Sequence, residues 1–289
     1  MLLAMDRGFF AKHRKVLRTR MLHWVELAGA DNFPKSPLTY PDDSVVLKDD
    51  ERYRCIHYDA MRTFNHEAHR KLLERFLFAV QQDLGEYSGI AFMASLLRLG
   101  LTDEESLAVL RKIDHDYIPG HWQREAVGFA TSAYVIEEFI RRRFPDVAAH
   151  LDSLHLQPVT YMQKIISGLT IHVLPFDMMF SFLDTFMAEG FAFLVKFELA
   201  IFEHFRSEIL SINDDSRISE LFDILRLDTK VVEHADMKRI LDRAQRMSRR
   251  GLDGESIAAL RSKVYKEKVA PLLQRAKPSG LEEDDVMTE

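Results

Sequence analysis

Apolar residues recur three and four positions apart along nearly the whole chain, and few stretches alternate apolar and polar residues at every second position. This spacing is typical of amphipathic helices. Near the start, Leu17, Met21, Trp24 and Val25 form such a stripe, and Gly29 follows as a stop signal. The pattern predicts an all-α fold, built as a single large helical domain or as two helical subdomains.

The same pattern predicts further helices in the first half of the chain, over residues 51–61, 66–80, 88–99, 103–113 and 121–143. Thr102 and Glu105 have the spacing of a capping box, in which each side chain bonds to a free backbone amide at the helix start. The connector 32–44 contains Pro34, Pro37 and Pro41 and therefore cannot be helical throughout. It is predicted to be an ordered surface loop.

In the second half, two helices are expected to flank the Leu174-Pro175 break, the second of them carrying Asp184, Glu189 and Gly190. Shorter, more charged helices are predicted over 216–227, 231–248 and 255–275, with Pro271 disturbing the last. The ending 280–289 is acidic and poor in apolar residues, so it is predicted to be a disordered tail.

Composition narrows the class of protein. A formal net charge of −6 and a pI near 6.1 argue against sequence-independent binding of nucleic acid. Cys55 is the one cysteine, which excludes an intrachain disulfide and indicates a reducing compartment such as the cytosol. Asp6 and Arg7 interrupt the apolar start, so no signal peptide is predicted. Charged residues also interrupt the apolar stretch 165–205, and no transmembrane segment is expected.

The chain lacks the glycine-rich nucleotide-binding motifs and the GxSxG motif of serine hydrolases. His66 and His69 share a helix, but no further ligand follows at metal-site spacing, so neither a metal site nor a cofactor is expected. The run Arg141-Arg142-Arg143 ends a predicted helix, where it interacts favourably with the helix dipole. Binding to an acidic patch on a partner or to anionic lipid is the alternative interpretation of this run.

Four residues form the string IxxDxxRT: Ile56, Asp59, Arg62 and Thr63. Upstream, Arg20 and Trp24 fit an RxxxW pattern; downstream, an ordered series follows at His150-Leu151, Pro158, Tyr161, Leu174-Pro175, Leu183-Asp184-Thr185-Phe186 and Glu189-Gly190. On these motifs the chain resembles the TBC domain family of Rab GTPase-activating proteins. The resemblance places this domain at 14–248, after an N-terminal extension at 1–13 and before a C-terminal helix and acidic tail at 249–289.

The resemblance implies a role for each of these residues. Arg62 would be an arginine finger, supplied in trans to neutralise charge that develops on GTP during hydrolysis. Asp59 would hold the segment that carries Arg62, and Ile56, Thr63, Arg20 and Trp24 would support the site. The implied partner is a Rab-like small GTPase with its own bound GTP and Mg²⁺. The protein would then be cytoplasmic and peripheral to endomembranes through that GTPase, with its oligomeric state open.

The family's second catalytic element, a glutamine in a YxQ motif, has no counterpart here. Aligned on Gly85 and Gly89, the chain has Ser88 at the glutamine position, preceded by Tyr87. A serine hydroxyl is too short to replace the amide directly. Gln81 and Gln82 lie upstream, but they are interpreted more simply as solvated helix positions. Two hypotheses remain: an activator that relies on the glutamine of its GTPase, and a noncatalytic module that binds a GTPase as a scaffold or effector.

Overall fold

The computed structural model describes residues 7–40, 51–87 and 89–276 of the 289-residue chain. Ser88, the acidic ending 280–289, residues 41–44 of the connector and residues 1–6 of the N-terminal extension lie outside the described residues. Within the described ranges the chain is helical without strands, apart from one isolated bridge between Tyr87 and Gln123. The predicted all-α class is confirmed.

The first half begins with a long helix that ends where the sequence predicts. Gly29 has φ +80°, a conformation that favours glycine, and it directly follows the first helix. The predicted capping box is present, since Glu105 Oε2 accepts from the Thr102 amide at 2.8 Å and the Thr102 hydroxyl accepts from the Glu105 amide at 3.2 Å. The elements are α1 (Arg7–Ala28), η2 (Ala30–Asn32), α2 (Glu51–Thr63), α3 (Glu67–Leu84), α4 (Ala91–Leu97), α5 (Asp103–Lys112) and η3 (Ile113–Tyr117).

The second half contains the most hydrophobic helices and ends in the predicted short charged ones. Its elements are α6 (Val127–Arg143), α7 (Pro145–Ser153), η4 (Pro158–Thr160), α8 (Gln163–Ile166), α9 (Phe176–Glu189), α10 (Phe191–His204), α11 (Arg206–Ser211), η5 (Asp215–Arg217), α12 (Ile218–Leu225), α13 (His234–Arg246), α14 (Gly254–Val264), η6 (Tyr265–Val269) and α15 (Ala270–Ala276). The predicted disturbance near Pro271 is a π turn, η6, immediately before α15. Proline has no amide hydrogen to give to a preceding carbonyl, and a wider turn accommodates this.

The prediction of one helix over 121–143 is wrong for its first turn and a half. The helix begins at Val127, after a turn in which Gly120 and Ala126 have φ of +72° and +42°. In that turn Trp122 is buried, and its indole nitrogen donates to the carbonyl of Ser167 at 3.0 Å. This long-range contact keeps residues 121–126 out of the helix.

Several other predicted boundaries also differ from the structure. The helix expected over 88–99 begins at Ala91 and ends at Leu97. Upstream of Leu174-Pro175 the expected helix is only the four residues of α8, and Gly190 follows α9 with φ +62° rather than lying within it. Glycine in this conformation ends α9 and separates it from α10.

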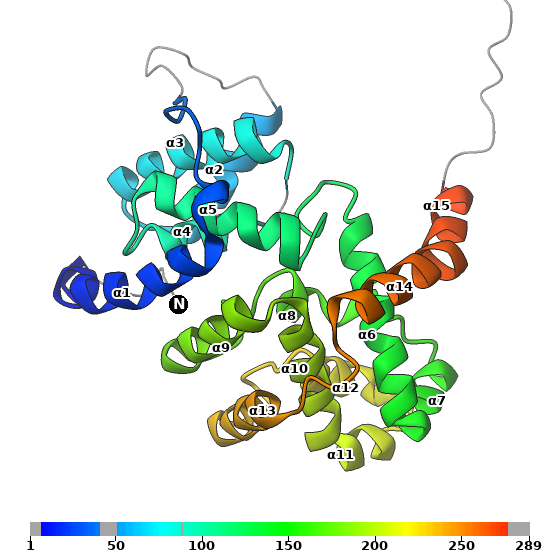
Figure 1. Cartoon of the computed structure of the whole chain (residues 1–289). Coiled ribbons are helices and arrows are strands. Elements are labelled where there is room, and N and C mark those ends of the chain that lie inside the picture. The colour runs from blue at the N-terminus through cyan, green and yellow to red at the C-terminus, as the bar shows by residue number, and fades with distance from the viewer. Residues whose placement is uncertain (1–6, 41–50, 88, 277–289) are drawn as a thin grey trace, which may run out of the picture.

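Figure 1 shows α2 to α5 gathered at one end of the molecule and α7 and α10 to α13 at the other, and α14 packs against α6. Helix α1 contacts both α5 and α9, so it connects the two ends. The core between α9 and α10 is aromatic, with Phe182 in contact distance of Phe193 and Phe197 at 5.1 and 4.9 Å between ring centroids. No helix among the described residues is long and apolar enough to cross a membrane.

Candidate functional site

Helix α2 presents Arg62 on its solvent side and buries the opposite side. Ile56, Ala60 and Thr63 are 3%, 0% and 1% exposed, at the spacing of one helical face. The Thr63 hydroxyl donates to the Asp59 carbonyl at 2.6 Å, the turn-closing bond that threonine often makes inside a helix. Packing of this face against the core fixes the direction in which the Arg62 side chain leaves the helix.

Arg62 is exposed but held in place. Its side chain is 69% exposed, and its Nη2 lies 2.9 Å from Asp59 Oδ1, while its Nε donates to the Tyr58 carbonyl at 3.3 Å. Asp59 is only 20% exposed. Burial raises the pKa of the Asp59 carboxyl, and the positive charge of Arg62 opposes this shift. The predicted pair of Asp59 and Arg62 is therefore formed. Its carboxylate lies on the buried side of the pair, and its guanidinium lies on the solvent side.

The loop between α3 and α4 lies close to this pair. The Tyr87 hydroxyl donates to the Leu77 carbonyl at 2.7 Å, and the Tyr87 backbone bridges to Gln123. Burial raises the pKa of Tyr87, and the negative charge of Asp59 raises it further. Gly89 has φ +86°, so this loop depends on a glycine there. The fold thus brings Tyr87 close to Asp59.

Arg20 and Trp24 lie elsewhere, at the contact between α1 and α9. Asp184 Oδ2 accepts from Arg20 Nε at 2.8 Å, and Asp184 Oδ1 accepts from the Trp24 indole nitrogen, also at 2.8 Å. Trp24 is fully buried and stacks on Phe180 with ring centroids 5.8 Å apart. Among the described residues, neither Arg20 nor Trp24 contacts Arg62 through a hydrogen bond or an ion pair. Their role in this structure is to join two helices.

The structure adds residues that the sequence reasoning missed. Tyr58 and Met61 are 59% and 44% exposed and precede Arg62 on α2 by four residues and by one. They are the large hydrophobic side chains that the described part of α2 exposes to solvent. The sequence could have indicated their exposure, because both residues lie outside the apolar stripe that α2 buries. Gln82, in contrast, lines a pocket formed by residues 34–39, Asp83 and Arg111, away from this surface.

No group of three or more metal-ligating side chains occurs in the ranges that the structure describes. His66 has a local role instead, because its ring nitrogen accepts from the Ala68 amide at 3.3 Å and so caps the start of α3.

The fold is that of solved TBC domains. A flagellar RabGAP TBC domain from Chlamydomonas is similar with a TM-score of 0.60 and 17% identity, over 85% of this chain and 86% of that one. The TBC domain of Skywalker/TBC1D24 from Drosophila melanogaster is similar with a TM-score of 0.58 and 15% identity, over 90% and 92%. At these identities the likeness establishes the fold.

Sequence comparison identifies the family. The model of the Rab-GTPase-TBC domain matches residues 18–210, well over half of the chain, and the chain therefore belongs to this family. Growth hormone-regulated TBC protein 1 of Rattus norvegicus is 23% identical over 242 residues, which are 80% of this chain and 78% of that protein. Rab GTPase-activating protein eat-17 of Caenorhabditis elegans is 23% identical over 178 residues, 61% of this chain but only 18% of that protein.

Proposed function

We propose that the chain is a GTPase-activating domain for a Rab-type small GTPase and that Arg62 is the side chain it inserts into the nucleotide site of that GTPase. The observation that supports this most directly is an exposed guanidinium tethered to a half-buried carboxylate on a helix packed into the core. GTP and Mg²⁺ belong to the GTPase, and this chain supplies no cofactor. The protein would work in the cytoplasm, at endomembranes where its GTPase resides.

The geometry suits the chemistry of phosphoryl transfer. Negative charge spreads over the phosphoryl oxygens in the transition state, and a guanidinium that is already oriented stabilises it without further reorganisation. A guanidinium has five N–H donors, and Arg62 uses only two of its nitrogens in contacts with Asp59 and Tyr58. The remaining donors face solvent, where they can reach phosphate oxygens.

In this proposal the GTPase binds to the exposed side of α2. Tyr58 and Met61 offer apolar contact area beside Arg62. Burying them against a GTPase would also exclude water around the guanidinium, which strengthens its interaction with phosphate.

A screen of the purified chain against a panel of GTP-loaded Rab proteins tests the proposal. We expect accelerated GTP hydrolysis for one or a few members of the panel, measured by phosphate release. Hydrolysis at the intrinsic rate for every Rab that binds the chain would count against activation and favour the scaffold.

The second candidate function is a noncatalytic module that holds a GTPase, and serine at position 88 supports it. Without the family's glutamine, the attacking water must be positioned by the GTPase itself or not at all. Ser88→Gln separates the two candidates. A further rise in hydrolysis would identify a site that lacks one element; unchanged hydrolysis with retained binding of the GTP-loaded Rab would identify a scaffold.

A further inference from the structure

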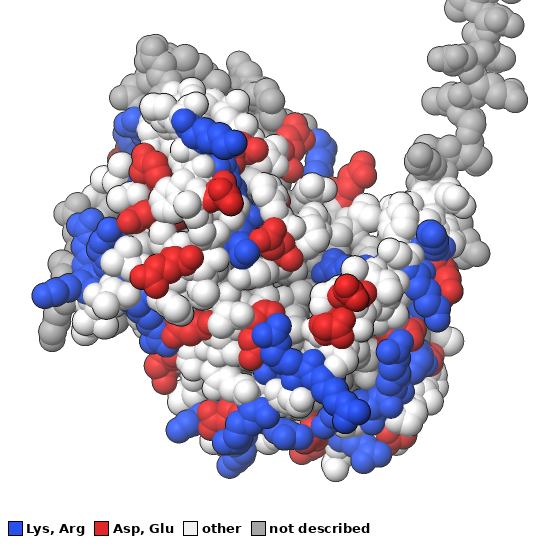
Figure 2. Space-filling view, in the orientation of Figure 1, with Lys and Arg blue, Asp and Glu red and all other residues white. Residues whose placement is uncertain are grey.

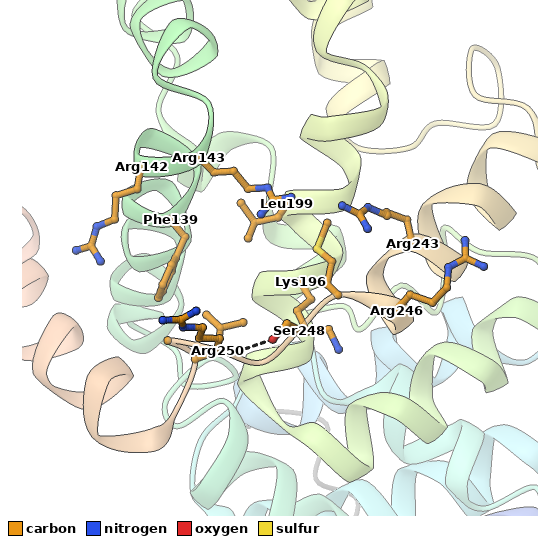
Figure 3. A pocket seen from close by; sticks show the side chains of 12 residues that line it. Phe139, Arg142, Arg143, Lys196, Leu199, Arg243, Arg246, Ser248 and Arg250 are labelled. Atoms are coloured by element: carbon orange, nitrogen blue, oxygen red, sulfur yellow. Dashed lines mark hydrogen bonds between the residues drawn. The ribbon is translucent and has the colours of Figure 1, made fainter.

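A second feature of the surface lies at the other end of the molecule, on α6, α10, α13 and the segment that follows α13. A cavity of about 700 Å³ opens there. Its lining includes Arg142 and Arg143 of α6, Lys196 of α10, and Arg243 and Arg246 of α13, and Figure 3 shows the Arg142 and Arg246 guanidiniums turned toward the outside of the cavity. Arg250 approaches from the connecting segment between α13 and α14. We call this cavity the basic pocket.

The residues that line the basic pocket carry charge of one sign. Six of them are basic and none is acidic: Arg142, Arg143, Lys196, Arg243, Arg246 and Arg250. In Figure 2, lysine and arginine side chains gather over the corresponding lower part of the face shown. In a chain whose net charge is −6, this concentration of positive charge is local and not a consequence of composition.

Three of the six basic side chains are held by carboxylates. Glu203 accepts from Arg243 Nε at 2.9 Å and Nη2 at 3.2 Å, and from Arg143 Nη2 at 3.1 Å. Lys196 is 1% exposed, and its ammonium contacts both oxygens of Glu189 at 2.9 and 3.1 Å. Glu203 therefore fixes two guanidiniums while leaving most of their N–H donors unused.

The other three basic residues have no such partner. Arg142, Arg246 and Arg250 form no side-chain ion pair with any residue in the part of the chain that the structure describes. Arg142 instead lies over the ring of Phe139, at 5.6 Å. Like charges brought around one cavity repel each other unless an anion is bound between them. The arrangement is therefore complementary to a multivalent anion.

We propose that the basic pocket binds a small anion that carries two or more phosphate groups. Guanidinium groups match phosphate because they offer paired N–H donors in one plane. The volume lies within the range of small-molecule sites and exceeds what a single phosphate fills. Phe139, Leu199, Met247 and Leu252 add apolar walls, which suit a carbon ring bearing the phosphates.

Nucleic acid fits the basic pocket poorly. Proteins that bind a nucleic-acid backbone use an extended positive groove along it, whereas the basic pocket is a single concave site. Two sources offer the proposed chemistry: a soluble inositol polyphosphate and the headgroup of a phosphoinositide in a membrane. The second source would bring the domain to a lipid surface independently of any GTPase. The basic pocket and Arg62 lie on different helices, so binding at one can be tested without the other.

The test uses the full chain with two probes: inositol trisphosphate in calorimetry, and phosphatidylcholine vesicles containing phosphatidylinositol bisphosphate in flotation. The variant carries Arg142→Gln, Arg246→Gln and Arg250→Gln together. These three arginines form no ion pair among the described residues, so their replacement leaves no carboxylate without its partner. The matched control is Arg239→Gln, an exposed arginine of α13 that pairs with Asp236 at 2.6 Å and does not line the pocket. If the triple variant fails to fold, Arg250→Glu alone is used.

We expect the wild-type chain and Arg239→Gln to bind with equal affinity, and the triple variant to bind at least tenfold more weakly. Arg62→Ala should bind as the wild type does, whatever the outcome of the hydrolysis screen. Binding of both probes identifies a membrane lipid as the source, and binding of inositol trisphosphate alone identifies a soluble ligand. No binding of either probe by the wild type, or equal weakening by Arg239→Gln, would overturn the proposal.

Discussion

Replacing Asp59 by alanine separates the positioning of Arg62 from the stability of α2. In the structure Asp59 is half-buried, and its single described side-chain partner is the exposed Arg62, at 2.9 Å. An exposed pair three residues apart in a helix stabilises the fold by only about 0.3–0.5 kcal/mol. Burial of the carboxylate opposes this gain, because burial raises the pKa of Asp59. We therefore expect the free energy of unfolding to change by no more than about 0.5 kcal/mol.

The effect on stimulated hydrolysis should be larger. An arginine side chain carries about 2 kcal/mol of rotamer entropy. Of its two tethers, Arg62 keeps only the bond from Nε to the Tyr58 carbonyl when Asp59 is removed. If roughly half of the entropy returns, reaching the transition state costs about 1 kcal/mol more, which lowers kcat/KM by about fivefold.

The assay is GTP hydrolysis under single-turnover conditions with a responsive Rab, paired with urea unfolding of each variant. Asp59→Asn is the matched control, because its amide oxygen can still accept from Arg62, and its kcat/KM should fall less. The reasoning would be refuted by an unchanged kcat/KM in Asp59→Ala. It would also be refuted if the loss of activity were matched by a comparable loss of stability.

Two further predictions concern stability. Glu198 is fully buried, its carboxylate oxygens have no hydrogen-bond partner among the described residues, and burial raises its pKa well above 4.5. The folded state then holds a proton that the unfolded state releases. The free energy of unfolding should therefore fall by up to about 1.4 kcal/mol per pH unit as the pH rises above the pKa of Glu198 in the unfolded chain. Urea unfolding between pH 5 and 8 should show this slope, and Glu198→Gln should flatten it; an equal slope in both would contradict the assignment. Asp184→Ala should lower the free energy of unfolding by about 1–3 kcal/mol, because the buried Trp24 indole loses its acceptor. Calorimetric melting checks this, and an unchanged melting temperature would show that Trp24 does not need Asp184.

Local signals in the sequence predicted much of the fold. The end of α1 at Gly29 and the start of α5 at Thr102 depend on residues within one turn, so the sequence contains the information. The start of α6 does not follow from local signals. It depends on the bond from Trp122 to the carbonyl of Ser167, 45 residues away, which periodicity does not reveal.

The candidate site divides in the same way. Asp59 and Arg62 lie three residues apart on one helix, and their pairing follows from helix geometry. The approach of Tyr87 to Asp59 depends on how α2, α3 and α4 pack, and the bond from Arg20 to Asp184 joins residues 164 positions apart. The run Arg141-Arg142-Arg143 ends α6, as the sequence predicts, and the structure adds that Arg142 and Arg143 line the basic pocket while Arg141 pairs with Asp152.

The central claim is that Arg62 acts in trans on GTP bound to a Rab-type GTPase. The most direct measurement is the rate of stimulated hydrolysis for Arg62→Ala beside the wild type, with Arg217→Ala as an exposed arginine outside the site. Arginine fingers accelerate hydrolysis by about 10³–10⁵-fold. We expect Arg62→Ala to lose nearly all of the stimulation while it still melts like the wild type, and Arg217→Ala to keep full activity. Stimulation by Arg62→Ala at the wild-type rate would contradict the claim.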